Sequence, residues 1–158
     1  MKENPYDEDI FFHQYSQFPR SVQGLKAAGE WHALKALLPD FQGKRVLDLG
    51  CGFGWHCAYA AQQGAAQVLG TDISRKMLER ARAQTREPQV SYRQIAMEDI
   101  DFPADSFDVV ISSLALHYVE DYAGVCRRVY DCLAPGGDFV FSCEHPVFTA
   151  EGRQEWYA

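Results

Sequence analysis

The sequence lacks the features that mark zinc fingers, disulfide frameworks, secreted proteins and membrane spans. Its five cysteines form no CxxC pair, and no cluster of cysteine and histidine has zinc-finger spacing. An odd number of cysteines argues against a complete disulfide framework, so reduced and mostly buried thiols are expected. No apolar run approaches the roughly 18 residues of a membrane helix, and residues 1–5 open no secretory signal. These absences predict a cytoplasmic protein without a membrane span.

Positive charge is also scarce. The 158 residues include 22 acidic and 15 basic ones, which gives a formal net charge of -7. Nucleic-acid backbones and anionic membranes both need a positive face, so neither is expected as the main partner. The length fits one compact domain and is too short for two. The expected partner is a small, neutral or cationic, partly apolar molecule.

Short apolar stretches alternate with helical patterns along most of the chain. The expected strands cover residues 45–49, 68–71, 90–95, 107–112 and 138–143. The expected helices cover residues 21–38, 54–63, 121–133 and a stretch that Ser74 opens and Pro88 breaks. This alternation predicts a doubly wound α/β fold, a Rossmann-like, mostly parallel sheet with helices on both faces. Residues 1–20 are irregular and rich in aromatic side chains, which indicates a segment that packs onto the fold.

A glycine-rich turn follows the first expected strand, at the sheet edge where such folds bind ligands. Residues 48–54 read DLGCGFG, and three alternating glycines let the backbone approach a ligand closely. A dinucleotide site would continue with a third glycine of G-x-G-x-x-G at position 55, but Trp55 stands there. The carboxylate of Asp48 would repel a pyrophosphate and attract an ammonium group. The turn therefore favours a ligand with an amino-acid end, and the alternative is a plain strand–helix connection.

Acidic side chains follow the second and third expected strands. Asp72 can accept both hydroxyl protons of a ribose, or it can help Ser74 to cap the next helix. Residues 96–100 form a loop that can hold an adenine, with Met97 as the flat apolar contact. The alternative for this loop is an acidic surface segment.

The fourth expected strand leads into residues 112–118, which would face the acceptor. His117 is the first candidate for a general base, and the alternative is a packing or hydrogen-bonding histidine. Tyr118 and His145 are weaker candidates. Histidine and acidic residues are too scattered to predict a metal site.

Together these motifs resemble those of the class I S-adenosylmethionine-dependent methyltransferases, closest to the group that includes quinone-biosynthesis and other small-molecule methyltransferases. The resemblance covers residues 43–145, and its motif order is specific for fold and cofactor but not for substrate. The segments that carry it are 46–54 (VLDLGCGFG), 69–74 (LGTDIS), 98–103 (EDIDFP), 106–110 (SFDVV) and 133–137 (LAPGG).

The resemblance implies S-adenosylmethionine as cofactor, S-adenosylhomocysteine as product, and in-line transfer of the methyl group to an acceptor O, N, C or S atom. The implied cofactor-binding residues are Asp48, Gly50, Cys51, Gly52 and Gly54 for the methionine portion, Asp72 for the ribose, Ile73, Met97 and Glu98 around the adenine, Leu114 beside the sulfonium, and Met77. Tyr15 and Arg20 would close over the cofactor, with Arg20 pairing its carboxylate; alternatively Arg20 is a surface residue. Many relatives carry an acid where this chain has Ala96, so the adenine amino group could be met by Glu98, Asp99 or water.

The chain ends at Ala158, whereas the resembled fold continues through a further helix and two strands. Residues 1–158 are thus expected to be a single domain, with an aromatic cap at 1–20, the cofactor-binding fold at 21–145 and the start of a truncated substrate-side segment at 146–158. An exposed sheet edge would then permit a homodimer. Alternative functions are a non-catalytic cofactor-binding protein, an inactive fragment and a nicotinamide-dependent oxidoreductase.

Overall fold

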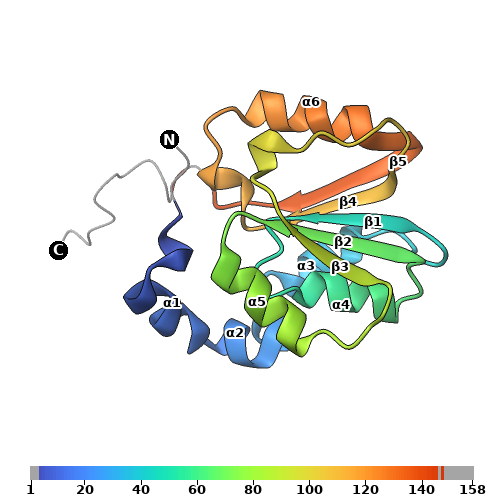
Figure 1. Cartoon of the computed structure of the whole chain (residues 1–158). Coiled ribbons are helices and arrows are strands. Elements are labelled where there is room, and N and C mark those ends of the chain that lie inside the picture. The colour runs from blue at the N-terminus through green and yellow to red at the C-terminus, as the bar shows by residue number, and fades with distance from the viewer. Residues whose placement is uncertain (1–3, 146, 148–158) are drawn as a thin grey trace.

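The computed structural model describes residues 4–145 and residue 147, and its centre is one five-stranded parallel sheet (Figure 1). The strand order is β3-β2-β1-β4-β5. The strands are β1 (Arg45–Leu49), β2 (Gln67–Asp72), β3 (Val90–Gln94), β4 (Phe107–Ser113) and β5 (Leu133–Ser142). The predicted doubly wound α/β fold is confirmed, with a switch point between β1 and β4, where the chain order reverses.

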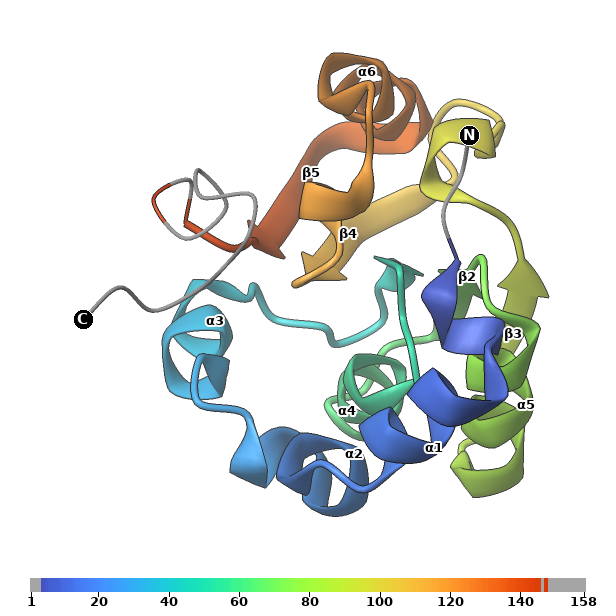
Figure 2. The same ribbon diagram turned by 90° about the vertical axis from the view of Figure 1, so that its left-hand side faces the viewer.

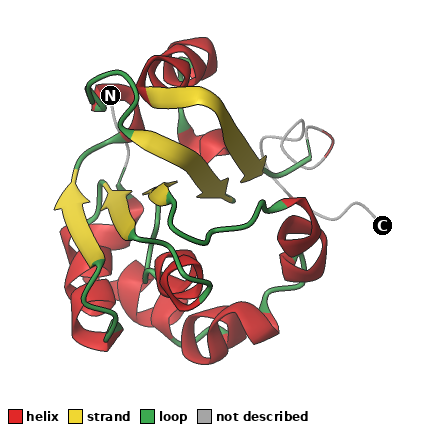
Figure 3. Cartoon of the chain, turned by 90° about the vertical axis from the view of Figure 1, so that its right-hand side faces the viewer, coloured by secondary structure: helices red, strands yellow, loops and turns green. Residues whose placement is uncertain are grey.

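Helices cover both faces of the sheet (Figures 1 and 3). One face carries α3 (Trp31–Leu37), α4 (Trp55–Gln62) and α5 (Arg75–Gln84), and the other carries α6 (Tyr122–Cys132). Strand β1 is buried on both sides: Val46 packs into the core on the α4 face, and Leu47 and Leu49 pack into the core on the α6 face. This double burial explains why the central strands read as continuous apolar runs.

Two helix starts follow the sequence closely. The Ser74 hydroxyl accepts a hydrogen bond from the Met77 N–H at 3.1 Å and caps α5, as predicted. Asp121 caps α6 by accepting from the Gly124 N–H at 2.8 Å. Both caps satisfy backbone donors that a helix start leaves without partners.

The helix expected over 21–38 is wrong. The chain instead forms α2 (Pro19–Gln23), the 3-10 helix η2 (Gly24–Ala27) and α3. Gly24 causes the break, because its φ of +65° is outside the helical region and a Cβ there would lie 2.8 Å from the Trp55 ring. The chain therefore turns where it contacts α4.

The residues expected to be irregular before position 21 are largely helical. They contain the 3-10 helix η1 (Pro5–Asp7) and α1 (Asp9–Ser16). Figure 2 shows α1 and α2 beside α4 and α5. The rings of Phe12 and Tyr15 both meet Phe53 edge-on, with centroids 5.9 and 5.8 Å away. The aromatic side chains thus pack this segment against the glycine-rich turn.

Strand β5 begins five residues before the expected position 138, and the residues of the expected turn at 135–137 lie inside it. Leu133 pairs with Phe107 and Asp138 pairs with Val109, so the register shifts across this stretch. The ladder is irregular here, because the five steps from Leu133 to Asp138 on β5 lie opposite the two steps from Phe107 to Val109 on β4, and Gly136 in this stretch has a φ of +77°. Among the described helices, none has the length and the apolar character that crossing a membrane requires.

Candidate functional site

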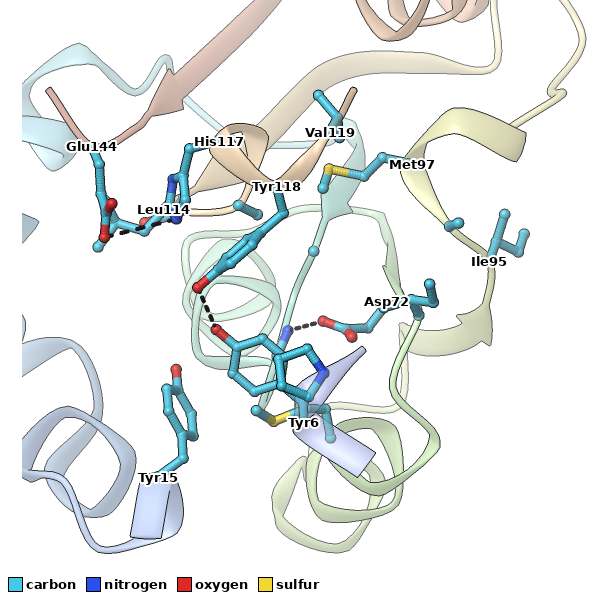
Figure 4. Close-up of a pocket in the computed structure, with 18 of the residues that line it drawn as sticks. Tyr6, Tyr15, Asp72, Ile95, Met97, Leu114, His117, Tyr118, Val119 and Glu144 are labelled. Atoms are coloured by element: carbon cyan, nitrogen blue, oxygen red, sulfur yellow. Dashed lines mark hydrogen bonds and ion pairs between the residues drawn. The ribbon is translucent and has the colours of Figure 1, made fainter. Parts of the chain in front are cut away.

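A pocket of about 310 Å³ opens at the carboxyl ends of β1, β2 and β4 (Figure 4). Its volume lies in the range of small-molecule sites. Most of the residues predicted from the sequence line it: Tyr15, Arg20, Gly50, Gly52, Asp72, Ile73, Met77, Met97, Glu98, Leu114 and His117. Asp48, Cys51 and Gly54 were predicted too, but they are not among the lining residues.

The glycine-rich turn forms one wall and needs its glycines for geometric reasons. Gly50, Gly52 and Gly54 all have positive φ, at 69°, 53° and 77°. A Cβ on Gly50 would lie 2.5 Å from the Ala115 Cβ, whereas a Cβ on Gly52 would meet nothing within 4 Å. Gly50 therefore permits contact between the ends of β1 and β4, and Gly52 leaves bare backbone facing open space.

Asp72 takes the capping role that the sequence left open, and it also lines the pocket. One carboxylate oxygen accepts from the Gly52 N–H at 2.8 Å, and the other accepts from the Ser74 N–H at 2.8 Å. Asp72 thus ties the glycine-rich turn to the start of α5 while also lining the pocket. Burial raises its pKa, and the backbone N–H donors oppose that rise. Because each carboxylate oxygen can accept two hydrogen bonds, both oxygens keep acceptor capacity for a ligand.

Asp48 lies beneath the turn rather than at the pocket surface. Its side chain is 1% exposed, and one oxygen accepts from the Cys57 thiol at 3.2 Å. The other oxygen has no hydrogen-bond partner. Burial raises the pKa of Asp48 to about 7. The Asp48 carboxylate therefore has no direct contact with the pocket.

The end of β4 places Leu114 in a strained backbone conformation. Leu114 has a φ of +50°, which is rare for a residue with a side chain. Its N–H donates to the Ser142 carbonyl at 2.9 Å and lies 3.2 Å from the Ser142 hydroxyl. Strand β5 thus holds Leu114 in place at the pocket wall, where strain of this kind often marks a functional position.

The N-terminal segment forms part of the pocket wall. The hydroxyls of Tyr6 and Tyr118 lie 2.9 Å apart, and both side chains line the pocket (Figure 4). Asp7 fixes this segment by accepting from the Ser74 hydroxyl at 2.6 Å and the Lys76 N–H at 3.1 Å. Tyr6 was not predicted as a site residue. The only sign of its position in the sequence is the aromatic composition of the N-terminal segment.

Arg20 lines the pocket but already has a partner within the chain. Its guanidinium forms an ion pair with Glu30 at 2.7 Å. The other charged lining residues, Asp72, Glu98 and Glu144, are acidic. The pocket therefore carries an excess of negative charge, which favours a cationic ligand.

His117 and Glu144 stand together on the side of the pocket that β4 and β5 form (Figure 4). His117 Nε2 lies 3.9 Å from Glu144 Oε1, and His117 Nδ1 is buried without a hydrogen-bond partner. Glu144 was missed because nothing in the sequence shows which residue after β5 turns toward β4. His145, a weaker candidate base, is exposed and does not line the pocket.

Comparison with known proteins agrees with this geometry. A solved S-adenosylmethionine dependent methyltransferase from Mesorhizobium loti superposes with a TM-score of 0.77 at 53% identity, over 79% of this chain and 57% of that one. A ubiquinone biosynthesis O-methyltransferase from Neisseria meningitidis is 37% identical over 65% of this chain. A tRNA U34 carboxymethyltransferase from Trichlorobacter lovleyi is 31% identical over 91% of this chain.

The chain spans less than half the length of these two curated relatives, 45% and 46% respectively. The names of the two relatives refer to different acceptors, so the acceptor does not follow from similarity. Membership of the family does follow from similarity, because the family model described as a methyltransferase domain matches residues 47–141. This match confirms the resemblance seen in the sequence motifs: the chain belongs to the methyltransferase domain family.

Proposed function

We propose that this protein is an S-adenosylmethionine-dependent methyltransferase that methylates a small molecule by in-line displacement. The observation that carries the proposal is the placement of Asp72. Its carboxylate is held by two backbone N–H groups at the switch point of the sheet, and it borders a pocket with excess negative charge. An adenosine with a positively charged sulfonium matches both features.

The residues present fit this cofactor. The open space at Gly52 admits a ligand against bare backbone, and Asp72 keeps acceptor capacity for ribose hydroxyls. Gly50 and Gly52 would hold the methionine portion, and Leu114 would border the sulfonium. Around the adenine we place Ile73, Met77, Met97 and Glu98, all of which line the pocket. When bound, S-adenosylmethionine supplies an activated methyl group on a sulfonium leaving group.

The contribution of the chain is then to position the acceptor and to exclude water. The hydroxyls of Tyr6 and Tyr118 meet at the pocket wall, and Tyr15 also lines the pocket. The rival function is disfavoured because Trp55 stands where the third glycine of a dinucleotide-binding turn belongs.

Three further parts of the proposal concern the acceptor, the assembly and the location. The formal net charge of -7 favours a small acceptor over nucleic acid. Within the described residues β5 pairs only with β4, and Phe141 on β5 is 37% exposed, which supports a homodimer through this edge. Free thiols at Cys126 and Cys143 fit a cytoplasmic location.

Calorimetric titration with S-adenosylhomocysteine tests the proposal, with NAD as the competing ligand. We expect the protein to bind S-adenosylhomocysteine and not NAD. Asp72→Asn should weaken binding at least tenfold, because hydrogen bonds to a charged group contribute about 1.5–3 kcal/mol each. The exposed Glu120→Gln is the matched control and should bind normally, and thermal melting checks that both variants fold. Binding of NAD alone would identify an oxidoreductase, and binding of neither ligand would refute the proposal.

A further inference from the structure

Three tyrosines from separate parts of the chain line the pocket together. Tyr6 belongs to η1, Tyr15 belongs to α1, and Tyr118 ends the 3-10 helix η4 (Leu116–Tyr118). Figure 4 shows the hydroxyls of Tyr6 and Tyr118 meeting, with Tyr15 on the same side of the pocket. We call these three side chains the aromatic box.

The rings of the aromatic box stand nearly at right angles, as adjacent walls of a box do. The Tyr6 ring is 88° from the plane of Tyr15 and 87° from the plane of Tyr118, with centroids 5.2 and 6.1 Å away. The 2.9 Å contact between the hydroxyls of Tyr6 and Tyr118 holds one side, and the packing of Tyr15 on Phe53 holds the other. The face of an aromatic ring carries partial negative charge and attracts a cation within about 6 Å of its centroid. Several rings around one cavity therefore favour a cation that carries methyl groups.

Carboxylates add to this preference for positive charge. The carboxylates of Asp72, Glu98 and Glu144 line the same pocket, whereas the guanidinium of Arg20 is already paired. Burial raises the pKa of the Tyr6 hydroxyl, and the charge of Asp72 raises it further, so this phenol stays neutral. The rings and the carboxylates thus favour the same kind of ligand.

The charge of the reacting pair separates the possible classes of acceptor. A weakly basic oxygen or sulfur acceptor reacts best after it has lost a proton, so it enters as an anion and leaves two neutral products. A free amine reacts through its lone pair as a neutral molecule, and the positive charge of the sulfonium passes to nitrogen. The amine route keeps one positive charge in the pocket from start to finish, whereas carboxylates in the lining repel an anionic acceptor.

We propose that the aromatic box binds the acceptor and that the acceptor is an alkylamine, whose methylated product is an ammonium cation. This inference rests on the proposed function, because the methyl group must come from the cofactor. The nitrogen lone pair forms a bond to the methyl carbon, and the electron pair of the carbon–sulfur bond stays on sulfur. Charge balances, because nitrogen gains the positive charge that sulfur loses. A tertiary amine releases no proton in this step, so the transfer does not depend on His117 as a general base.

The first experiment measures the binding of choline at saturating S-adenosylhomocysteine, with 3,3-dimethylbutan-1-ol as the neutral probe. The two molecules have nearly the same shape, but only choline carries a positive charge. We expect choline to bind at least tenfold more tightly than the alcohol. Equal affinities, or no binding of choline, would overturn the inference. Displacement of S-adenosylhomocysteine by choline would also overturn it, because the aromatic box would then belong to the sulfonium of the cofactor.

Variants at Tyr6 separate the effect of the ring from that of its hydroxyl. Tyr6→Phe keeps the ring and should bind choline within about twofold of wild type. Tyr6→Leu removes the ring and should weaken choline binding about fivefold or more, with a smaller effect on the neutral alcohol. An equal loss for both probes would show a merely structural role. Tyr118→Leu repeats the test at a side chain that is 58% exposed, and the exposed Glu120→Gln is the matched control that should change neither affinity.

The second experiment measures methyl transfer from S-adenosylmethionine to N,N-dimethylethanolamine, again with 3,3-dimethylbutan-1-ol as the neutral control. Since only the free base has a lone pair to donate, the rate at low amine concentration should rise with pH and level off above the pKa of the amine. Transfer to the alcohol, or to neither molecule, would overturn the inference. Should S-adenosylhomocysteine bind while choline does not, the amine inference fails and the methyltransferase proposal stands; absence of S-adenosylhomocysteine binding in the wild type removes both.

Discussion

Substitution of Gly50 by alanine should reveal how closely the ends of β1 and β4 approach. The Cβ of Gly50→Ala would lie 2.5 Å from the Ala115 Cβ, at a φ of +69°. Carbon atoms pack best at about 3.5–4.0 Å, so one chain segment must move by about 1 Å. The left-handed conformation costs about 1–2 kcal/mol, and overpacking a tight contact costs about 1–3 kcal/mol. We therefore expect the free energy of unfolding to fall by roughly 2–5 kcal/mol.

Two further variants separate these costs in urea denaturation. Gly43→Ala is the matched control, because Gly43 has a φ of +71° and its Cβ would meet nothing within 4 Å. The free energy of unfolding of Gly43→Ala should fall only by the cost of the left-handed backbone conformation, about 1–2 kcal/mol. Ala115→Gly removes the atom with which Gly50→Ala collides, so the double variant should recover about 1–3 kcal/mol relative to the sum of the single variants. Simple additivity of Gly50→Ala and Ala115→Gly would refute the argument from close contact.

Two buried or paired carboxylates should give opposite pH dependence of the free energy of unfolding, measured by urea denaturation from pH 2 to pH 8. Burial raises the pKa of Asp48 from 3.8 to about 7, so the buried carboxyl group destabilises the folded protein increasingly as the pH rises through that window. Between pH 4 and pH 8, the free energy of unfolding of Asp48→Asn should therefore rise relative to wild type by on the order of 2–4 kcal/mol. No rise would contradict the burial argument. Hydrogen bonds from Arg45 lower the pKa of Asp108 from 3.8 to about 2. The ionised Asp108 therefore stabilises the folded protein above pH 3.8, and this stabilisation is lost as the pH falls toward 2. Because the Arg45 side chain is 37% exposed, we expect Asp108→Asn to cost only about 1 kcal/mol at pH 7; an equal cost at low pH would contradict this assignment.

The sequence was sufficient to predict the parts of the fold that depend on local pattern. Strands β1, β2 and β4 follow from short apolar runs, and β3 follows from Val90 and Tyr92 alternating with polar residues. The start of α5 follows from the capping preference of Ser74. The glycine-rich turn was predictable because three alternating glycines signal backbone that other residues rarely adopt, and all three have positive φ. Each of these features is decided within a few residues of chain.

Features decided by distant contacts were not predictable. The apolar spacing over 21–38 is that of one helix, yet Gly24 turns because the Trp55 ring occupies the space beside it. Glu144 and Tyr6 enter the pocket only because β5 pairs with β4 and because Asp7 binds the start of α5. No periodicity in one segment can report where another segment will lie.

At Asp72 the structural role and the proposed role in ribose binding need not compete. Its two backbone hydrogen bonds fix the orientation of the carboxylate before any ligand arrives. The same bonds leave acceptor capacity on both oxygens, so the helix cap prepares the site for a ligand with paired hydroxyls. Preparation of this kind lowers the ordering cost of binding, and the same contacts tie the glycine-rich turn to α5. A change at Asp72 should therefore affect the affinity for the cofactor and the stability of the turn together, which is why the binding experiment requires melting data on the same variant.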